Sequence, residues 1–224
     1  MDLNEHFNKR KEVSGYFSVF ILMFLLTFVP LLLPDREGLL RKGLLFPVLY
    51  LIEFFVIVPL YLLFFKNRAC MGRGKINGKH FAVMLCIILI IQLVLPRLLG
   101  MRQSEGWMLA QVSLPGWSLV LNVALLAFIV PIYEEIVFRG CLFGALKYWF
   151  GGRIYPAAIV MSLIFTLLHT QYADWRTLFL LLLVSLTLSI ARVKSDGLYL
   201  PIMLHMAMNG IVTLIFYLAV VLLK

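Results

Sequence analysis

Residues 117–138 read WSLVLNVALLAFIVPIYEEIVF and set the fold class of this chain. The run is apolar apart from a few side chains, and a helix needs about 20 predominantly apolar residues to cross a bilayer. It therefore predicts a transmembrane helix. Near its end the run carries two adjacent carboxylates, Glu134 and Glu135. A charged side chain at the centre of a span costs roughly 2.5–3.5 kcal/mol on insertion scales, so both are candidate functional residues.

The rest of the chain has the same apolar character. Of its 224 residues, 62% are hydrophobic and only 14% are charged, whereas soluble domains are about half apolar and about a quarter charged. A water-soluble fold has no place to bury that much apolar surface. We therefore predict one membrane domain over residues 1–224, in which residues 1–116 form N-terminal spans of unassigned role.

Further apolar segments on both sides of this run predict further helices. The expected spans are Tyr16–Leu33, Leu44–Phe65, Phe81–Leu99, Trp117–Phe138, Ala157–Thr170, Thr177–Ala191 and Leu198–Leu223. Segment Gly140–Phe150 would add a half-helix, which gives about 7–8 spans. The runs are continuously apolar, whereas the strands of a membrane barrel alternate in polarity. The predicted fold class is all-α, a polytopic transmembrane helix bundle with the lipid bilayer around it.

The basic residues predict the topology of the bundle. The net charge is +9, from 20 Lys and Arg against 11 Asp and Glu, and cytoplasmic loops carry the excess of Lys and Arg. Seven spans with a cytoplasmic N-terminus place 13 basic residues inside: Lys9, Arg10, Lys11, Lys66, Arg68, Arg73, Lys75, Lys79, Arg139, Lys147, Arg153, Arg192 and Lys194. The other side holds Arg36, Arg41, Lys42, Arg97, Arg102, Arg176 and Lys224. We therefore expect a cytoplasmic N-terminus in a bacterial cytoplasmic membrane, with Lys66–Lys79 as a flexible cytoplasmic loop.

Several other classes of feature are not supported. Tyr16–Leu33 is longer than the apolar core of a signal peptide, which is about 7–15 residues, so we expect an uncleaved first span. Cys70, Cys86 and Cys141 are far apart and show no CxxC spacing, which predicts free thiols rather than disulfides or a thiolate metal site. The sequence has no basic stripe interleaved with aromatic residues, so we expect no nucleic-acid partner.

The first polar group within the spans combines Glu134, Glu135 and Arg139. Glu135 and Arg139 are four residues apart, so on a helix they share a face and can pair. Glu134 lies about 100° around the helix from Glu135 and cannot easily share that partner. One carboxylate is then structural, and the other is free to act as a general base. The alternative is a charge cluster at the membrane edge, with side chains that reach the interface.

Two further polar groups occupy later spans. Phe165 and His169 end one apolar run, and His205 and Asn209 share one face of the last span. The alternatives to a functional role are an interfacial side chain for His169 and helix–helix hydrogen bonds for the other pair. Taken together, the three groups offer a base, a proton shuttle and polar donors for a developing oxyanion. Peptide hydrolysis requires these components.

The order EExxxR, FxxxH and HxxxN resembles the CAAX-protease and bacteriocin-processing family, also called the Abi family, which includes the type II CAAX prenyl endopeptidases. The motifs stand here without a departure, at Glu134-Glu135-Arg139, Phe165-His169 and His205-Asn209. They cover residues 117–223, and the first three spans carry no such resemblance.

The resemblance implies an intramembrane endopeptidase whose catalytic core is residues 117–224, with a cavity that opens toward the cytosol. In it Glu134 and His169 would activate the attacking water, and His205 and Asn209 would stabilise the oxyanion. Glu135, Arg139 and Phe165 would support the site. The substrate would be a membrane-associated protein or peptide, cleaved near its end. We expect no cofactor; the alternative is Zn²⁺ bound by Glu134, His169 and His205, since one carboxylate and two imidazoles form a known ligand set.

Other functions remain as alternatives. A non-catalytic bacteriocin-immunity or scaffold protein would keep the polar cluster for helix packing. A small proton-coupled transporter would use Glu134 and the histidines as a relay, although no inverted pair of interrupted helices is found. The sequence has no HExxH and no GxSxG, which disfavours zincin-type and serine-type sites. Glu53 lies in the second predicted span, and two alternatives stay open for it: a helix–helix hydrogen bond or a role in substrate access.

Overall fold

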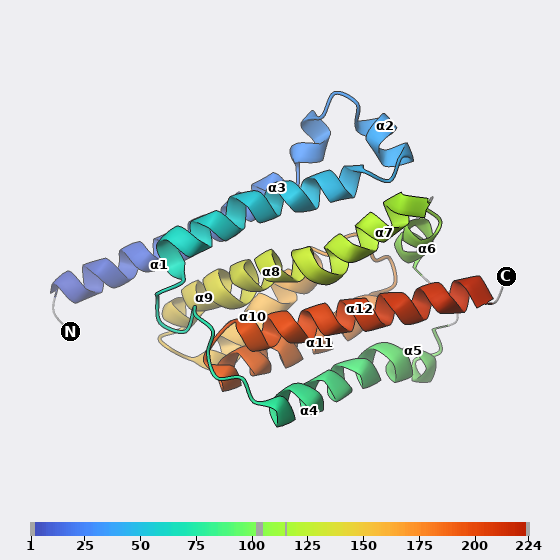
Figure 1. Ribbon diagram of the computed structural model, residues 1–224. Helices are drawn as coiled ribbons and strands as arrows, with labels where there is room; N and C mark the ends of the chain where they lie inside the picture. Colours follow the sequence, from blue (N-terminus) through green and yellow to red (C-terminus); the bar gives the residue numbers. More distant parts are fainter. Residues whose placement is uncertain (1–2, 102–104, 115, 223–224) are drawn as a thin grey trace.

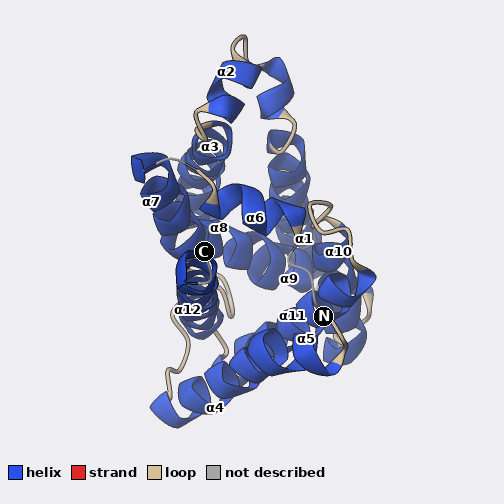
Figure 2. Ribbon diagram, turned by 90° about the vertical axis from the view of Figure 1, so that its right-hand side faces the viewer, coloured by secondary structure: helices blue, strands red, loops and turns tan. Residues whose placement is uncertain are grey.

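The computed structural model describes residues 3–101, 105–114 and 116–222, and over these residues it contains helices and connections but no strand (Figures 1 and 2). The α-helices are α1 (Leu3–Leu26), α2 (Arg36–Arg41), α3 (Leu45–Leu60), α4 (Gly78–Leu89), α5 (Leu95–Leu98), α6 (Gly106–Val112), α7 (Gly116–Ala124), α8 (Val130–Glu135), α9 (Phe143–Trp149), α10 (Ile154–Leu167), α11 (Trp175–Ser195) and α12 (Tyr199–Leu222). A 3₁₀ turn occupies Val29–Leu32, and wider π-helical segments occupy Tyr61–Phe65, Ile90–Val94, Leu125–Ile129 and Ile136–Leu142. Arg102, Leu223 and Lys224, which the topology and span predictions used, lie outside the described residues.

Five helical units are long and apolar enough to cross a membrane. They are Leu45–Phe65, Gly78–Leu98, Gly116–Trp149, Trp175–Ser195 and Tyr199–Val220. The all-helical membrane class is therefore confirmed, but the predicted 7–8 spans are not. Helix α1 begins in a polar, charged stretch and ends at Leu26, well before Leu33. Helix α10 has only 14 residues.

The predicted half-helix over Gly140–Phe150 is the end of one continuous helix, Gly116–Trp149, of 34 residues. At a rise of about 1.5 Å per residue this helix is about 50 Å long, whereas the hydrocarbon core is about 30 Å thick. The helix therefore extends beyond the hydrocarbon at one end or both, unless it tilts strongly.

Pro131 lies inside this long helix, and its effect on the backbone matters for the site. A proline has no N–H to donate and its ring clashes with the preceding turn. The helix accommodates it by widening over Leu125–Ile129, where the Val130 N–H donates to the Leu125 carbonyl, five residues back. In that five-residue register the Leu126 carbonyl would accept from residue 131, which is a proline and has no N–H. The Leu126 carbonyl therefore needs a partner from outside its own helix.

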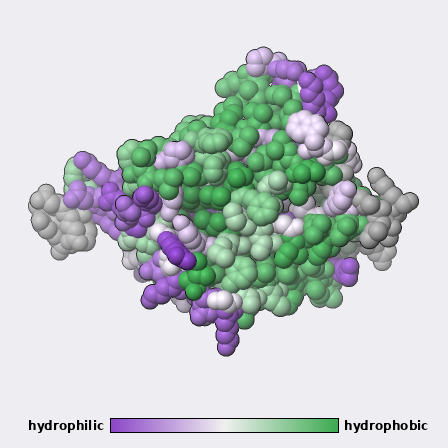
Figure 3. Space-filling view, viewed as in Figure 1, coloured by the Kyte–Doolittle hydropathy of each residue, from purple (hydrophilic) through white to green (hydrophobic). Residues whose placement is uncertain are grey.

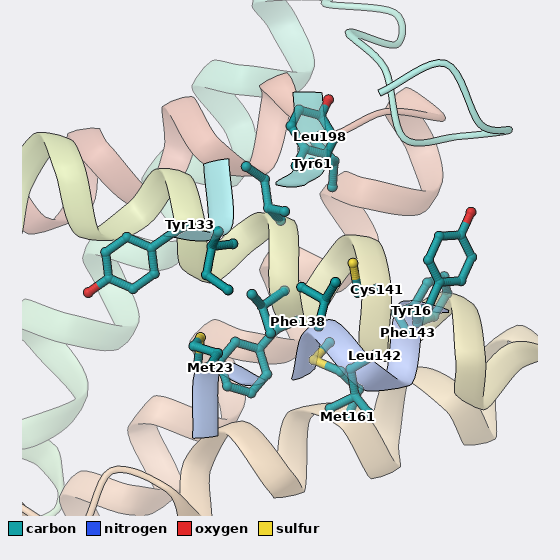
Figure 4. Close-up of a cluster of buried hydrophobic side chains, with 14 of the residues drawn as sticks. Tyr16, Met23, Tyr61, Tyr133, Phe138, Cys141, Leu142, Phe143, Met161 and Leu198 are labelled. Atoms are coloured by element: carbon teal, nitrogen blue, oxygen red, sulfur yellow. The ribbon is translucent and has the colours of Figure 1, made fainter. Parts of the chain in front are cut away.

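The core lies where α1 packs against the second half of the long helix. Figure 4 shows Tyr16 and Met23 of α1 beside Phe138, Cys141 and Leu142, with Met161 of α10 and Leu198 around them. The surface is also largely apolar. Figure 3 shows a broad hydrophobic face (green), with hydrophilic residues (purple) gathered mainly toward its margins. Such an exposed apolar face fits a protein whose solvent is lipid. Cys70, Cys86 and Cys141 are free thiols, as predicted.

The connection from α3 to α4 is packed over part of its length, although the sequence predicted a flexible loop. The Lys75 N–H donates to the Ser195 carbonyl at 2.6 Å, and the Leu198 N–H donates to the Gly72 carbonyl at 2.9 Å. Met71 is buried against the long helix, with 1% of its surface exposed. The connection is thereby tied to the turn between α11 and α12.

Gly74 and Gly197 make the closest approach between these two segments. Gly74 has a φ of +70°, in the left-handed region where glycine is favoured. A Cβ on either glycine would collide with the backbone of the other segment. Both positions therefore require the absence of a side chain.

Candidate functional site

The predicted ion pair between Glu135 and Arg139 is present and fully buried. Arg139 Nη1 donates to Glu135 Oε1 at 3.0 Å, and both side chains have 0% exposure. Arg139 Nη2 donates to the Ser185 hydroxyl of α11 at 2.9 Å. The guanidinium also lies over the Phe165 ring, 4.5 Å from its centroid. This arrangement ties the long helix to α10 and α11 through one cation.

His205 joins the two adjacent carboxylates. Its Nδ1 lies 2.7 Å from Glu135 Oε1, and its Nε2 lies 3.9 Å from Glu134 Oε2. A carboxylate only accepts hydrogen bonds, so Nδ1 carries the proton in the bond to Glu135. Among the residues that the structure describes, Glu134 makes no polar contact closer than this one to His205, and 17% of its side chain is exposed.

His169 lies just beyond the end of α10. Its Nδ1 is 2.7 Å from the Phe165 carbonyl, which only accepts, so in the neutral ring Nδ1 carries the proton and Nε2 carries the lone pair. The His169 ring lies 4.4 Å from the Phe165 ring and 6.2 Å from the Tyr172 ring, centroid to centroid. Phe165 is thus the residue that positions His169, through both its carbonyl and its ring.

Asn209 supplies the hydrogen-bond donor that Pro131 cannot give to the Leu126 carbonyl. Its Nδ2 donates to the Leu126 carbonyl at 2.9 Å, which is the carbonyl left free in the widened helix. An amide nitrogen has two hydrogens. One of them is therefore used for helix packing, and the second is free of that bond.

The four predicted catalytic side chains line one cavity of about 250 Å³. Glu134, His169, His205 and Asn209 contribute to its wall together with Phe165, whereas Glu135 and Arg139 lie behind the wall. Sequence reasoning missed several other lining residues: Tyr50, Gln92, Trp107, Met108, Gln111 and Tyr172. Met108 carries no sequence signal, and the signal of the others is polarity or aromaticity within or beside apolar runs, which is common at membrane interfaces.

The cavity extends from Glu134 toward α6. Helix α6 and the connection between α10 and α11 form its wall at that end, and Figure 1 shows α6 at the end of the bundle opposite the connection from α3 to α4. The basic residues predict that this connection is cytoplasmic, and the resemblance implies a cavity that opens to the cytosol. The connection from α3 to α4 and the α6 end of the cavity thus lie at opposite ends of the bundle.

Two further groups border the site. Burial raises the pKa of Tyr172 to about 12, and the nearby carboxylates of Glu134 and Glu105 add to the effect, so its hydroxyl stays protonated. Glu53 of α3 is 4% exposed and interacts with the hydroxyl of Tyr133. Glu53 thus has a helix–helix partner, as one of its two predicted roles required.

Metal binding was the alternative for Glu134, His169 and His205. Among residues 3–101, 105–114 and 116–222, no group of three or more His, Cys, Asp or Glu side chains is arranged to hold a metal ion.

Part of the chain is similar to a known protein family. Residues 116–211 match the Rce1-like family of type II CAAX prenyl endopeptidases. The resemblance inferred from the three motifs is thereby confirmed over this segment. An uncharacterised 24.3 kDa protein of Escherichia coli is 35% identical over 97 residues, which are 43% of this chain and 44% of that relative. The match thus spans less than half the length of the relative, and no solved structure matches the chain.

The Rce1-like segment contains all the motif residues but not the whole cavity wall. Tyr50, Gln92, Trp107, Met108 and Gln111 precede residue 116 and line the same cavity. The first half of the chain therefore completes a cavity whose polar centre belongs to the Rce1-like segment.

Proposed function

We propose that this chain is an intramembrane endopeptidase that hydrolyses a peptide bond of a membrane-associated protein or peptide. One observation carries the proposal: Glu134, His169, His205 and Asn209, from three separate helical regions, line one cavity. A base and hydrogen-bond donors that converge on one space provide what attack of water on an amide requires.

Glu134 and His169 are the groups proposed to activate water. Glu134 has no hydrogen bond to another described side chain, and His169 presents the lone pair of Nε2 because Nδ1 is occupied by Phe165. A water between them would lose a proton to one of these groups as its oxygen attacks the carbonyl carbon. The same group would then return the proton to the leaving nitrogen, so that water is consumed and no other reactant is needed.

His205 and Asn209 are the proposed oxyanion donors. The proposal requires a protonated Nε2 on His205, which lies 3.9 Å from Glu134 Oε2, and it uses the second hydrogen of Asn209 Nδ2, which the Leu126 carbonyl leaves free. Both groups are fixed before substrate arrives, by Glu135 and by the Leu126 carbonyl. Preorganised donors of this kind each contribute on the order of 3–4 kcal/mol in other hydrolases.

Glu135 and Arg139 act as positioning residues in this proposal, because neither lines the cavity. Glu135 holds the His205 ring through Nδ1, and Arg139 balances the charge of Glu135. The proposal includes no metal. A chelator and Zn²⁺ enter the test below because one carboxylate and two imidazoles are the donor types of a known zinc ligand set.

The first experiment is cleavage of membrane-associated peptides by the purified full-length chain in detergent. We expect Glu134→Ala to abolish cleavage while the protein still inserts in the membrane and purifies normally. The matched control is Glu37→Ala, since the Glu37 side chain is 88% exposed and lies outside the cavity. A chelator should leave the wild-type rate unchanged.

Other outcomes favour the alternatives. Equal cleavage by wild type and Glu134→Ala would rule out Glu134 as a catalytic residue. Reduced abundance of Glu134→Ala, with no cleavage by either protein, would favour a scaffold or immunity role. Loss of cleavage on chelation with recovery on Zn²⁺ addition would make Glu134, His169 and His205 metal ligands. Proton-driven flux in vesicles would favour a transporter.

We propose a cytoplasmic N-terminus, as the basic residues predict, which puts the α6 end of the cavity on the other side of the membrane. The test introduces a cysteine at exposed Lys75 or at exposed Ser113, after removal of the native cysteines. In intact cells a membrane-impermeant thiol reagent should label Ser113→Cys but not Lys75→Cys. The reverse labelling would show a cavity on the cytosolic side and an inverted chain.

A further inference from the structure

Helix α6 lies across one end of the bundle, and Figure 2 shows it in front of the longer helices when the molecule is viewed from that end. Its Trp107 lines the cavity together with His169 and Tyr172. Glu105 directly precedes the helix. Both Glu105 and Trp107 contact the connection between α10 and α11, so α6 is joined to the segment that carries His169.

The Glu105 carboxylate holds the second half of this connection. Its Oε1 accepts from the Asp174 N–H at 3.2 Å and from the Thr177 hydroxyl at 2.6 Å, and its Oε2 accepts from the Ala173 N–H at 3.2 Å. Hydrogen bonds to an ionised acceptor are stronger than those between neutral groups. One side chain from before α6 therefore fixes the path of the chain immediately after Tyr172.

Tyr172 carries this constraint back to His169. The Tyr172 N–H donates to the His169 carbonyl at 3.2 Å, three residues back, which is the hydrogen bond of a β-turn. The Tyr172 ring is parallel to the His169 ring within 4°, with 6.2 Å between the centroids. The Trp107 ring meets Tyr172 edge-on, with 6.1 Å between the centroids. Both are attractive geometries for aromatic pairs.

The His169 ring has few other constraints. The residue follows α10 rather than lying within it. Its ring has one hydrogen bond among the described residues, from Nδ1 to the Phe165 carbonyl, and it contacts the Phe165 ring at 4.4 Å. One hydrogen bond fixes one atom of a ring but leaves its plane free to tilt. Misplacement of a reacting group by about 1 Å can cost on the order of a hundredfold in rate, so the plane of this ring matters.

We propose that Glu105 is a positioning residue for His169, which it holds through the turn from His169 to Tyr172 and through the Tyr172 ring. This inference rests on the proposed protease function and adds a residue that none of the three motifs contains. Glu105 precedes residue 116, so a segment outside the Rce1-like region sets the direction of a side chain within it. Loss of the Glu105 bonds leaves Glu134 in place but releases His169 Nε2.

The first measurement is independent of cleavage. Diethyl pyrocarbonate, which modifies unprotonated imidazole nitrogens, is added to the purified full-length chain in detergent, and each histidine is quantified by mass spectrometry. The readout is the labelling of His169 relative to His80, which is exposed on α4 and serves as an internal reference. Glu105→Ala and Tyr172→Ala should each raise this ratio at least threefold. Labelling of His205 should stay unchanged, because Glu135 holds that ring.

Matched variants separate the ring, the hydroxyl and the charge. Tyr172→Phe keeps the aromatic contacts and should label like wild type. Glu105→Gln keeps one acceptor oxygen but turns an NH₂ toward a backbone N–H, so its ratio should lie between wild type and Glu105→Ala. Glu37→Ala removes an exposed carboxylate and should have no effect. Thermal melting identifies a variant that fails to fold, and Thr177→Val, which removes one of the three donors, then takes its place.

Cleavage of membrane-associated peptides by the same variants tests the consequence for the reaction. Glu105→Ala and Tyr172→Ala should lower kcat on the order of tenfold to a hundredfold, because the water-activating group is no longer held in direction. Their KM should change by less than about threefold, since the loss falls on the chemical step. Tyr172→Phe should retain kcat close to wild type.

The outcomes separate this inference from the proposed function. An unchanged His169 ratio in both alanine variants would overturn it, and so would an equal rise at His205, which would show a general loosening of the fold. Cleavage by Glu105→Ala at the wild-type rate would overturn the inference and leave the protease standing. A rise confined to His169, with no cleavage by wild type, would support the positioning role of Glu105 and count against the protease.

Discussion

Replacement of Arg139 by methionine should strongly destabilise the protein. The side chain is fully buried and bonds to Glu135 and to the Ser185 hydroxyl at 3.0 and 2.9 Å. Methionine fills much of the same space but leaves the Glu135 carboxylate without its cation. Removal of one partner of a buried ion pair costs about 3–5 kcal/mol, because the other charge stays buried and uncompensated.

The measurement is thermal unfolding in detergent, followed by circular dichroism. For a chain of this size 1 kcal/mol corresponds to about 2–4 °C, so Arg139→Met should lower the melting temperature by about 6–20 °C. The double variant Arg139→Met, Glu135→Leu should recover part of this loss, since it removes the orphaned charge as well. It should not recover all of it, because His205 then loses its partner on Nδ1.

A loss below about 1 kcal/mol in Arg139→Met would refute the reasoning. So would a double variant that is less stable than Arg139→Met alone, because the buried Glu135 carboxylate would then not be the source of the cost. The conservative variant Arg139→Lys keeps the charge but cannot reach both partners with a fork of donors. We expect it to lie between wild type and Arg139→Met.

Two further predictions concern Asn209, which pairs with the widened helix, and the ion pair of Asp174 with Arg176 at the α6 end of the bundle. Asn209→Ala should destabilise the fold by about 1–3 kcal/mol in thermal unfolding, because it leaves the partly buried Leu126 carbonyl unpaired. Pro131→Ala should reduce that cost, since it restores an N–H. Equal costs in both backgrounds would contradict this explanation of the widened helix. The hydrogen bonds and charge of Arg176 hold the pKa of Asp174 below its ordinary value of about 3.9. The stability from this pair is therefore complete above that value and is lost as the pH falls through the lowered pKa. The melting temperature of Asp174→Asn should lie below wild type at neutral pH and converge with it in acid, and a gap that persists in acid would show that charge is not the cause.

The sequence predicted those features that depend on one helix at a time. Continuous apolar runs identify membrane helices because the backbone must satisfy its own hydrogen bonds in lipid. The pairing of Glu135 with Arg139 follows from their spacing, and it persists although the intervening turn is widened. The convergence of Glu134, His169 and His205 was expected from the resemblance rather than from any geometric rule.

Features that depend on contacts between helices were not predicted. The bond of Asn209 to the Leu126 carbonyl depends on the register that Pro131 imposes, which no residue pattern states in advance. The contribution of Gln111 to the cavity depends on where a short helix packs after a connection of unpredictable path. The first helix was misjudged because its apolar run was extended through Pro30, where the helix has already ended.

The close approach of Gly74 and Gly197 has a consequence for how such a protein can be divided. The segment that resembles known proteins begins at residue 116, yet its turn before α12 is shaped to receive the backbone of a loop far upstream. The segment that is similar to known proteins is therefore not a segment that packs independently of the rest of the chain. A fragment that begins at residue 116 would expose a notch that fits only a main chain without a side chain. A graft of foreign spans onto it would succeed only if the new linker brought its own glycine to the same place.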